Sequence, residues 1–272
     1  RYLFITIVEI MIEAHIQTEI LRRLKAAEVE HGMTVLYACE SGSRAWGFES
    51  PDSDYDVRFI YARPQEWYLS YNVETLPDVI EYPIVDEIDC SGWDVRKALY
   101  LFTRTNGALL EWLKSPVQYI ENGPLRQRLQ DLAPRAFNEI ALCYHYSHMA
   151  RGNAREYLFK EQVKLKKYLY VLRPLLAIRY IHDFGQPPPV EFQKLLDRVA
   201  PQEIVPGIEK LLELKKNSPE IGLGQSIPEL NEFIESELER HGETFKGQGR
   251  PDLLSGESVR KELNEIFRQV LI

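Results

Sequence analysis

The sequence has little cysteine and no long apolar run, and both absences limit the class of protein it can be. Three cysteines occur among 272 residues, far apart and without CxxC spacing: Cys39, Cys90 and Cys143. An odd number of isolated cysteines argues against a disulfide framework and a structural zinc site, so we expect a cytoplasmic protein. The apolar stretch at residues 2–11 is broken by polar side chains and is far shorter than a membrane span. It predicts neither a signal peptide nor a membrane anchor.

Motifs of several large enzyme classes are absent as well. The chain contains no Walker loop, GxGxxG fingerprint, nucleophile elbow or HExxH pair. Each of these motifs has the fixed spacing that a phosphate loop, a dinucleotide, a serine nucleophile or a zinc ion requires. Any catalytic chemistry therefore has to come from a different set of residues.

Positive charge is scarce overall but concentrated in one segment. The chain has 33 Lys and Arg against 41 Asp and Glu, and its net charge of −8 argues against non-specific coating of nucleic acid. Residues 151–180 nevertheless contain eight Lys or Arg and only two Glu. Lys160, Lys164 and Lys167 are spaced i, i+4 and i+7, which predicts one face of a helix. This face is either a phosphate-binding surface or an ordinary solvated one.

Hydrophobic periodicity in the first 120 residues predicts an α+β unit. Apolar and polar residues alternate from 55 to 61, which is the period of a strand, so Asp54 and Asp56 are expected to point the same way. Ser91 is a good N-cap for a following helix. The expected elements are a helix at 11–30, a strand at 34–39, a loop or short helix at 44–48, strands at 55–61 and 82–89, a helix at 92–105 and an edge strand at 116–120.

The rest of the chain has helical periodicity only. The turn at Asn122-Gly123-Pro124 predicts a boundary between a first domain at 11–122 and a helical domain at 123–272. No internal repeat is evident. Helices are expected at 125–132, 135–152, 154–183, 191–199, 201–215, 228–241 and 257–271.

A Gly-Ser turn and a pair of aspartates are the residues that indicate chemistry. Gly42 and Ser43 follow a short apolar strand, and Asp54 comes about eleven residues later with Asp56 beside it. Backbone N–H groups and a hydroxyl at such a turn can hold a phosphate. Two carboxylates at i and i+2 of a strand lie about 7 Å apart, which suits ligands of hard divalent cations. An Asp-x-Asp pair alone has little specificity, and an exposed strand face is the alternative.

The combination resembles the signature of the polymerase-beta nucleotidyltransferase superfamily, in which Gly-Ser is followed by Asp-x-Asp. More narrowly, the chain is similar to a bacterial and phage family of nucleotidyltransferases grouped as RNA-repair-pathway polymerase-beta proteins. The similarity continues through residues 92–97, 111–113, 115–116 and 166–174. It implies a polymerase-beta-like domain, with a small mixed sheet and helices, followed by an all-helical C-terminal domain.

The resemblance also implies a metal site. Two Mg²⁺ ions, or Mn²⁺, are expected on Asp54, Asp56 and a third carboxylate from the next strand. Asp89 is the first candidate for this third ligand, since it ends the expected strand. The alternatives are Asp86, Glu87 and Asp94, of which Asp94 fits better as an acid in the first turn of a helix.

Nucleotide-binding residues are expected on both sides of these carboxylates. Gly42 and Ser43 would hold the triphosphate, whereas Arg44 would reach the same phosphates or pair with a surface acid. Arg58 would steady the carboxylates or form an ordinary cross-strand pair. The lysines at 160, 164 and 167 would add positive charge. Interleaved tyrosines would stack on bases or pack in the core: Tyr157, Tyr168 and Tyr170.

The predicted function is transfer of a nucleoside monophosphate from an NTP or dNTP to a hydroxyl, with release of pyrophosphate. An RNA end is the first candidate for the acceptor, and a DNA end is possible. Two alternatives remain: nucleotidylation of a protein or a small molecule, and a non-catalytic nucleotide-binding module. The intact aspartate pair argues against the last, because two adjacent like charges repel without a metal. The pattern specifies neither the base nor a template, and it indicates no membrane partner.

Overall fold

A five-stranded mixed sheet forms one side of the protein. The computed structural model describes residues 12–158, 160, 162–217, 222–244 and 256–271. The strand order is β3-β4-β2-β1-β5, with β2 and β4 parallel and the other pairs antiparallel. The strands are β1 (Thr34–Glu40), β2 (Tyr55–Ala62), β3 (Val79–Glu81), β4 (Ile88–Asp94) and β5 (Gln118–Glu121).

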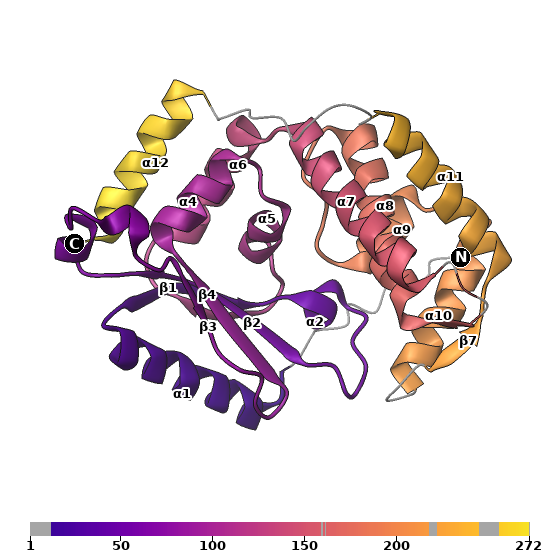
Figure 1. The fold of residues 1–272 in the computed structure, drawn as a ribbon, viewed down its shortest axis with the longest axis horizontal. Coiled ribbons are helices and arrows are strands. Elements are labelled where there is room, and N and C mark those ends of the chain that lie inside the picture. Colours follow the sequence, from indigo (N-terminus) through magenta and orange to yellow (C-terminus); the bar gives the residue numbers. More distant parts are fainter. Residues whose placement is uncertain (1–11, 159, 161, 218–221, 245–255, 272) are drawn as a thin grey trace, which may run out of the picture.

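Helices cover both faces of this sheet, and the larger group lies on one side (Figure 1). The helix α1 (Ala14–His31) covers the other face alone. The helices that follow in the chain are α2 (Gly42–Trp46), α3 (Gln65–Tyr68), α4 (Val95–Thr103), α5 (Gly107–Leu113), α6 (Leu125–Ala136), α7 (Glu139–Tyr157), α8 (Lys166–Phe184), α9 (Phe192–Val199), α10 (Val205–Asn217), α11 (Pro228–Thr244) and α12 (Glu257–Val270). The α+β class is confirmed.

Alternation of side chains along β2 decides which of them face the larger group of helices. Tyr55, Val57 and Phe59 are buried against α1 in one apolar cluster. Residues between them point to the opposite face because successive side chains of a strand alternate. Asp56 and Arg58 therefore lie on the side of the sheet that carries most of the helices. The expected strand at 55–61 is confirmed.

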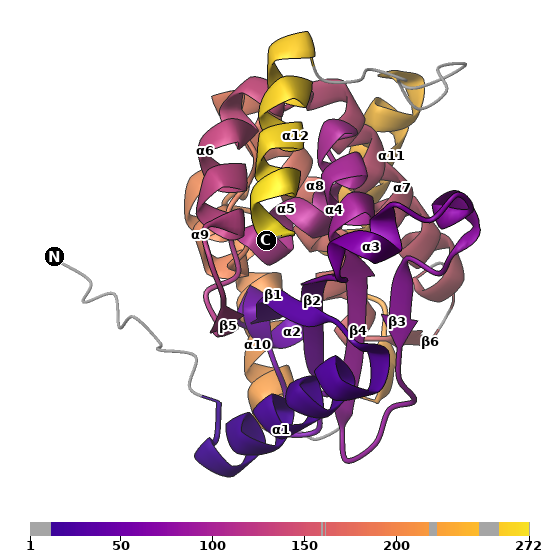
Figure 2. The same ribbon diagram turned by 90° about the vertical axis from the view of Figure 1, so that its left-hand side faces the viewer.

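One hydrophobic core joins the sheet to the helical half. It runs from Leu36 and Tyr37 of β1 through α7 and α8 to Ile266 of α12. The last helix returns to the sheet side of the molecule, where it packs on α4 and α6 (Figure 2). Apolar contacts thus continue across residue 122, and the division into 11–122 and 123–272 stays a prediction.

The third strand and its helix begin later than expected. Most of the expected strand at 82–89 is the hairpin connection between β3 and β4, with Asp86 and Glu87 in left-handed conformation at its turn, and only its last two residues belong to β4. Ser91 lies inside β4, so its predicted N-cap role is wrong. Asp94 caps α4 instead, accepting a hydrogen bond from the N–H of Arg96 at 2.8 Å.

The expected helix at 154–183 is also interrupted. It is divided into α7, β6 (Gln162–Lys164) and α8, and β6 pairs with β7 (Leu223–Gln225). The prediction that Lys160, Lys164 and Lys167 share one helix face is therefore wrong. Local periodicity could not show this break, because the partner strand lies far along the chain and Val163 is buried against the core.

No helix within the described ranges is long and apolar enough to span a membrane. The apolar stretch at 2–11, for which no membrane role was expected, and the predicted helix start at Met11 lie outside the described residues.

Candidate active site at the carboxylate edge of the sheet

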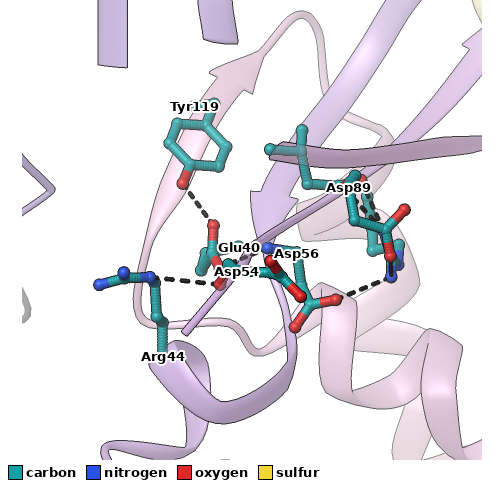
Figure 3. A network of polar contacts seen from close by, with 8 residues as sticks. Glu40, Arg44, Asp54, Asp56, Asp89 and Tyr119 are labelled. Atoms are coloured by element: carbon teal, nitrogen blue, oxygen red, sulfur yellow. Dashed lines mark hydrogen bonds and ion pairs between the residues drawn. The ribbon is translucent and has the colours of Figure 1, made fainter. Parts of the chain in front are cut away.

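Parallel pairing brings two of the predicted ligands together. β2 and β4 pair in a register that sets Asp56 beside Asp89. Paired residues of parallel strands project to the same face, so both carboxylates lie on the helical side of the sheet. Asp54 is exposed and directly precedes β2, next to Asp56 (Figure 3).

The other candidates for a third carboxylate are engaged elsewhere. Asp86 forms an exposed ion pair with Arg23 of α1 at 2.7 Å. Glu87 is exposed in the hairpin turn. Asp94 is buried at the opposite end of β4, where it caps α4. Only Asp89 of the four stands in register with Asp56, so it remains the candidate on geometric grounds.

Arg58 bridges the two paired carboxylates. One of its nitrogens, Nη2, lies 2.9 Å from Oδ1 of Asp56 and 2.7 Å from Oδ2 of Asp89. Its other terminal nitrogen donates to the carbonyl of Asp89 at 2.9 Å. The contact is more specific than an ordinary cross-strand pair, because a single guanidinium lies between two like charges, offsets part of their repulsion and fixes their spacing.

Burial and neighbouring charge raise the pKa of Asp56. Burial has the largest effect; the charges of Asp89 and Asp54 act in the same direction, and Arg58 opposes them. A carboxylate in this position gains from any additional cation nearby.

The donor set fits hard divalent cations in type and in charge. Three aspartates supply the oxygen ligands that Mg²⁺ and Mn²⁺ prefer. As the side chains lie, the described residues contain no ready group of three such ligands, and Arg58 holds Asp56 and Asp89. A cation bound by both aspartates would therefore exchange with part of the Arg58 contact.

Gly42 allows the loop backbone to approach Asp56. Its φ is +61°, and a Cβ built on it would lie 1.9 Å from Oδ2 of Asp56. Any side chain would therefore displace the carboxylate. Ser43, with 5% exposure, follows in the first turn of α2, where backbone N–H groups have no partner within the helix. The loop thus presents donors directly beside the aspartates.

Arg44 pins the turn that precedes the aspartates. Its guanidinium donates to the carbonyls of Ser53 at 2.7 Å and Asp54 at 3.3 Å, and it lies 3.8 Å from the centre of the Tyr55 ring. It contacts carbonyls and a ring, in place of the surface acid considered above. Its nucleotide-binding role stays a prediction.

Glu40 is a site residue to which the sequence analysis assigned no role. It is fully buried at the end of β1, where its carboxylate accepts hydrogen bonds from the N–H of Asp56 at 2.8 Å and the hydroxyl of Tyr119 at 2.5 Å (Figure 3). Burial raises the pKa of Glu40 to about 7. An acid at the end of an otherwise apolar strand was the available signal, since buried carboxylates occur mainly where they are paired.

The helical half contributes residues that sequence spacing did not group with the aspartates. Burial raises the pKa of Tyr170 of α8. The nearby charges of Asp56 and Asp54 act in the same direction, and Ser43 opposes them. Lys215 of α10 donates to the carbonyl of Phe48 at 2.5 Å. Burial lowers the pKa of Lys215 to about 8.

Of the three lysines predicted to bind nucleotide, two lie near the same tyrosine ring and the third does not. Lys167 lies 4.3 Å and Lys164 5.8 Å from the centre of the Tyr157 ring. Lys160 is exposed in the connection before β6, and no side-chain contact joins it to the site in the described part of the chain.

A buried ion pair ties the Gly-Ser loop to the helical half. Arg173 of α8 is 1% exposed and lies 2.9 Å from Glu111 of α5. Glu111 also accepts hydrogen bonds from Trp46 of α2 at 3.0 Å and Tyr146 of α7 at 2.8 Å. The network joins four helices, and Pro174 lies inside α8 without ending it.

A loop approaches an aspartate pair, and a third aspartate lies on the adjoining parallel strand of a small mixed sheet, which is the arrangement expected for the polymerase-beta type. The family model described as RNA repair pathway DNA polymerase beta family (RlaP) matches residues 16–269, and the chain belongs to this family.

Two individual proteins are similar to this chain to different degrees. An uncharacterized protein of Bacillus subtilis (strain 168), YcgL, is 47% identical over 228 residues, covering 84% of this chain and 87% of that protein. A solved nucleotidyltransferase-like protein from Exiguobacterium sibiricum is 14% identical, with 92% of this chain and 89% of that chain covered and a TM-score of 0.29.

Proposed function

We propose that the protein transfers a nucleoside monophosphate from a nucleoside triphosphate to an acceptor hydroxyl, with an RNA end as the first candidate, and releases pyrophosphate. The observation that carries this proposal is the register that sets Asp89 beside Asp56, with Asp54 and the Gly42 loop next to them.

The reaction forms a bond between the acceptor oxygen and the α-phosphorus and breaks the bond to the β-phosphate oxygen. Asp54, Asp56 and Asp89 would hold two Mg²⁺ ions, or Mn²⁺, which lower the pKa of the attacking hydroxyl and neutralise the leaving group. Asp89 would face the acceptor and help to take its proton. Ser43 and the loop N–H groups would orient the triphosphate, with Gly42 letting the loop lie against Asp56.

An RNA end is favoured over the alternatives by the family and by the charge of the helical half. The family is linked to an RNA repair pathway. A polynucleotide also offers several phosphates to the lysines around Tyr157. A protein or small-molecule hydroxyl is the second candidate acceptor. The third hypothesis is a non-catalytic nucleotide-binding module.

Pyrophosphate release tests the proposal. The protein is incubated with Mg²⁺ and each of the four ribonucleoside and four deoxyribonucleoside triphosphates, with an RNA end, a DNA end or no acceptor. The controls are Asp54→Ala and Asp56→Ala, with Asp86→Ala as a matched change of an acid outside the cluster. RNA-dependent release that disappears in the first two variants and persists in the third supports the proposal.

Other results separate the alternatives. Release without dependence on a polynucleotide moves the assignment to another acceptor. Metal-dependent triphosphate binding without release under any condition moves it to the binding module.

A further inference from the structure

Lysines and aromatic rings alternate along a path from the protein surface to the carboxylate edge, by which we mean Asp54, Asp56 and Asp89 at the starts of β2 and β4. Lys167 lies 4.3 Å from the ring centre of Tyr157 and 4.9 Å from that of Tyr170. Lys215 lies 5.9 Å from the Tyr170 ring and 4.7 Å from the Phe48 ring. With Lys164 at its outer end, we call this set the lysine–aromatic ladder: Lys164, Tyr157, Lys167, Tyr170, Lys215 and Phe48.

The ladder is assembled from segments far apart in the sequence. Tyr157 ends α7, Lys164 is in β6, and Lys167 and Tyr170 are in α8. Its inner end is formed by α10 and the loop after α2, which carries Phe48. The β6–β7 pairing holds the outer end, because Lys164 is the last residue of β6 and lies opposite Leu223.

The inner end reaches the proposed reaction centre. Tyr170 packs against the ring of Phe48 at 5.9 Å, in the loop that follows Gly42 and Ser43 of α2. Its ring also packs edge-on against Trp46 at 5.6 Å. A chain bound along the ladder would therefore end beside the aspartates.

Exposure decreases along the ladder. Lys164 is exposed, Lys167 and Tyr170 are partly buried, and Lys215 is 3% exposed. Only the outer members are therefore open to a ligand, and Lys215 adds its charge from beneath the surface. A base can stack on the Tyr157 ring only when it is unpaired, so the outer end favours a single strand that approaches at Lys164.

The exposed end of the ladder carries several neighbouring positive charges. None of the ion pairs between described residues involves Lys164, Lys166 or Lys167. Burial and the neighbouring ammonium groups of Lys166 and Lys164 lower the pKa of Lys167, and the carboxylate of Glu156 opposes them. Anions relieve such repulsion. A cation beside each ring also matches a nucleotide unit, which presents a phosphate next to a base that can stack.

We propose that the lysine–aromatic ladder binds the single-stranded end of the acceptor polynucleotide and leads it to the carboxylate edge. The inference rests on the proposed nucleotidyl transfer. It assigns Tyr157 to base stacking and Lys164 and Lys167 to phosphates near the reacting end.

Binding measured without turnover tests this proposal. Fluorescence anisotropy follows a labelled 12-nucleotide single-stranded RNA in EDTA, with a single-stranded DNA and an RNA duplex of equal length as further arms. The variants are Tyr157→Leu, Tyr157→Phe and Lys164→Gln. Lys261→Gln on α12 is the matched control, since it removes an exposed charge from another surface.

The expected results are quantitative. Tyr157→Leu weakens single-strand binding about tenfold, whereas Tyr157→Phe keeps the ring and the affinity. Lys164→Gln reduces the slope of log K against log salt by about 0.7, the value for one phosphate contact of a single strand. Lys261→Gln leaves affinity and slope as in the wild type. Thermal unfolding of each variant shows that the fold is retained.

Three results would overturn the proposal: a duplex that binds as tightly as the single strand, a Tyr157→Leu affinity equal to that of Lys261→Gln, or no RNA binding by the wild type. The DNA arm shows whether the sugar is recognised. Titration of wild-type protein with Mg²⁺ and a fluorescent triphosphate separates the two hypotheses. Triphosphate binding without RNA binding overturns the ladder and leaves transfer to another acceptor; RNA binding without triphosphate binding does the reverse.

Discussion

The carboxylate edge and the helical half assemble their polar groups in different ways. At the carboxylate edge, Asp54 and Asp56 are neighbours in sequence, and one strand pairing adds Asp89. In the helical half, Lys164 of β6 and Lys167 of α8 both lie near the ring of Tyr157, which ends α7. Short-range patterns therefore describe the first region well and the second poorly.

The two regions also differ in how charge is neutralised. Arg58 lies between the paired aspartates, and the buried Glu40 supports them from β1. The ladder lysines lie instead beside rings, which interact with a cation but leave its charge in place. The edge is thus prepared for cations and the ladder for anions.

The largest effect is expected from the aspartates at the edge. Asp56→Asn and Asp89→Asn should each lower the transfer rate about a thousandfold, because metal stabilisation of the transition state contributes several kcal/mol. Asp94→Asn should lower stability and leave most of the rate, since Asp94 caps α4 far from the edge. Rates and urea unfolding of the three variants check this. A loss of rate confined to Asp94→Asn would place the third carboxylate at the other end of β4.

The next largest effect concerns the junction between the two regions. Glu111→Gln or Arg173→Met should each lower the free energy of unfolding by about 3–5 kcal/mol, because either change leaves a buried charge unpaired. The double variant should lose clearly less than the two losses added together. Urea denaturation measures all three. Additive losses would mean that the pair does not act as one unit.

Glu40 should make stability depend on pH. Its pKa is raised in the folded protein to about 7, from 4.5. The folded state thus keeps a proton that the unfolded state releases, so stability is full below about pH 4.5 and falls as pH rises towards 7, by about 3 kcal/mol. Glu40→Gln should flatten this dependence, and Glu66→Gln, an exposed control, should not. Urea unfolding from pH 5 to 8 measures this dependence. An equal change of the free energy of unfolding with pH in the wild type and Glu40→Gln would contradict the prediction.

The smallest effect is expected from Asp86. Its ion pair with Arg23 is exposed, so Asp86→Ala should change the free energy of unfolding by less than about 1 kcal/mol and keep the transfer rate. Rate assays and thermal unfolding test both statements. A rate loss as large as that of Asp89→Asn would show that the hairpin turn moves to the edge during the reaction.

Prediction from sequence succeeded where a few adjacent residues carry the signal. The alternation in β2, the edge position of β5 and the α+β class all follow from short patterns, and each is confirmed. The start of β4 was misplaced because the expected strand at 82–89 covers the turn at Asp86 and Glu87 that joins β3 to β4. The break before α8 was missed because its cause, β7, lies beyond any local window.

The residues missed at the site share one property. Glu40, Lys215 and Arg173 are all buried charged side chains. In sequence Lys215 and Arg173 look like any surface base, since burial is decided by packing from other elements, and only Glu40 had a local signal in the apolar strand that it ends. Their partners come from β2, the loop after α2 and α5 respectively.

By itself, the sequence determined the family, the pairing of Asp54 with Asp56 on one strand face and the Gly-Ser turn before them, because motif spacing and strand alternation are local properties of the chain. Only the tertiary structure decided which acid stands beside Asp56, where the lysines lie and which charges are buried. Those outcomes depend on strand register and on packing between distant segments, whose contact energies no short stretch of sequence contains.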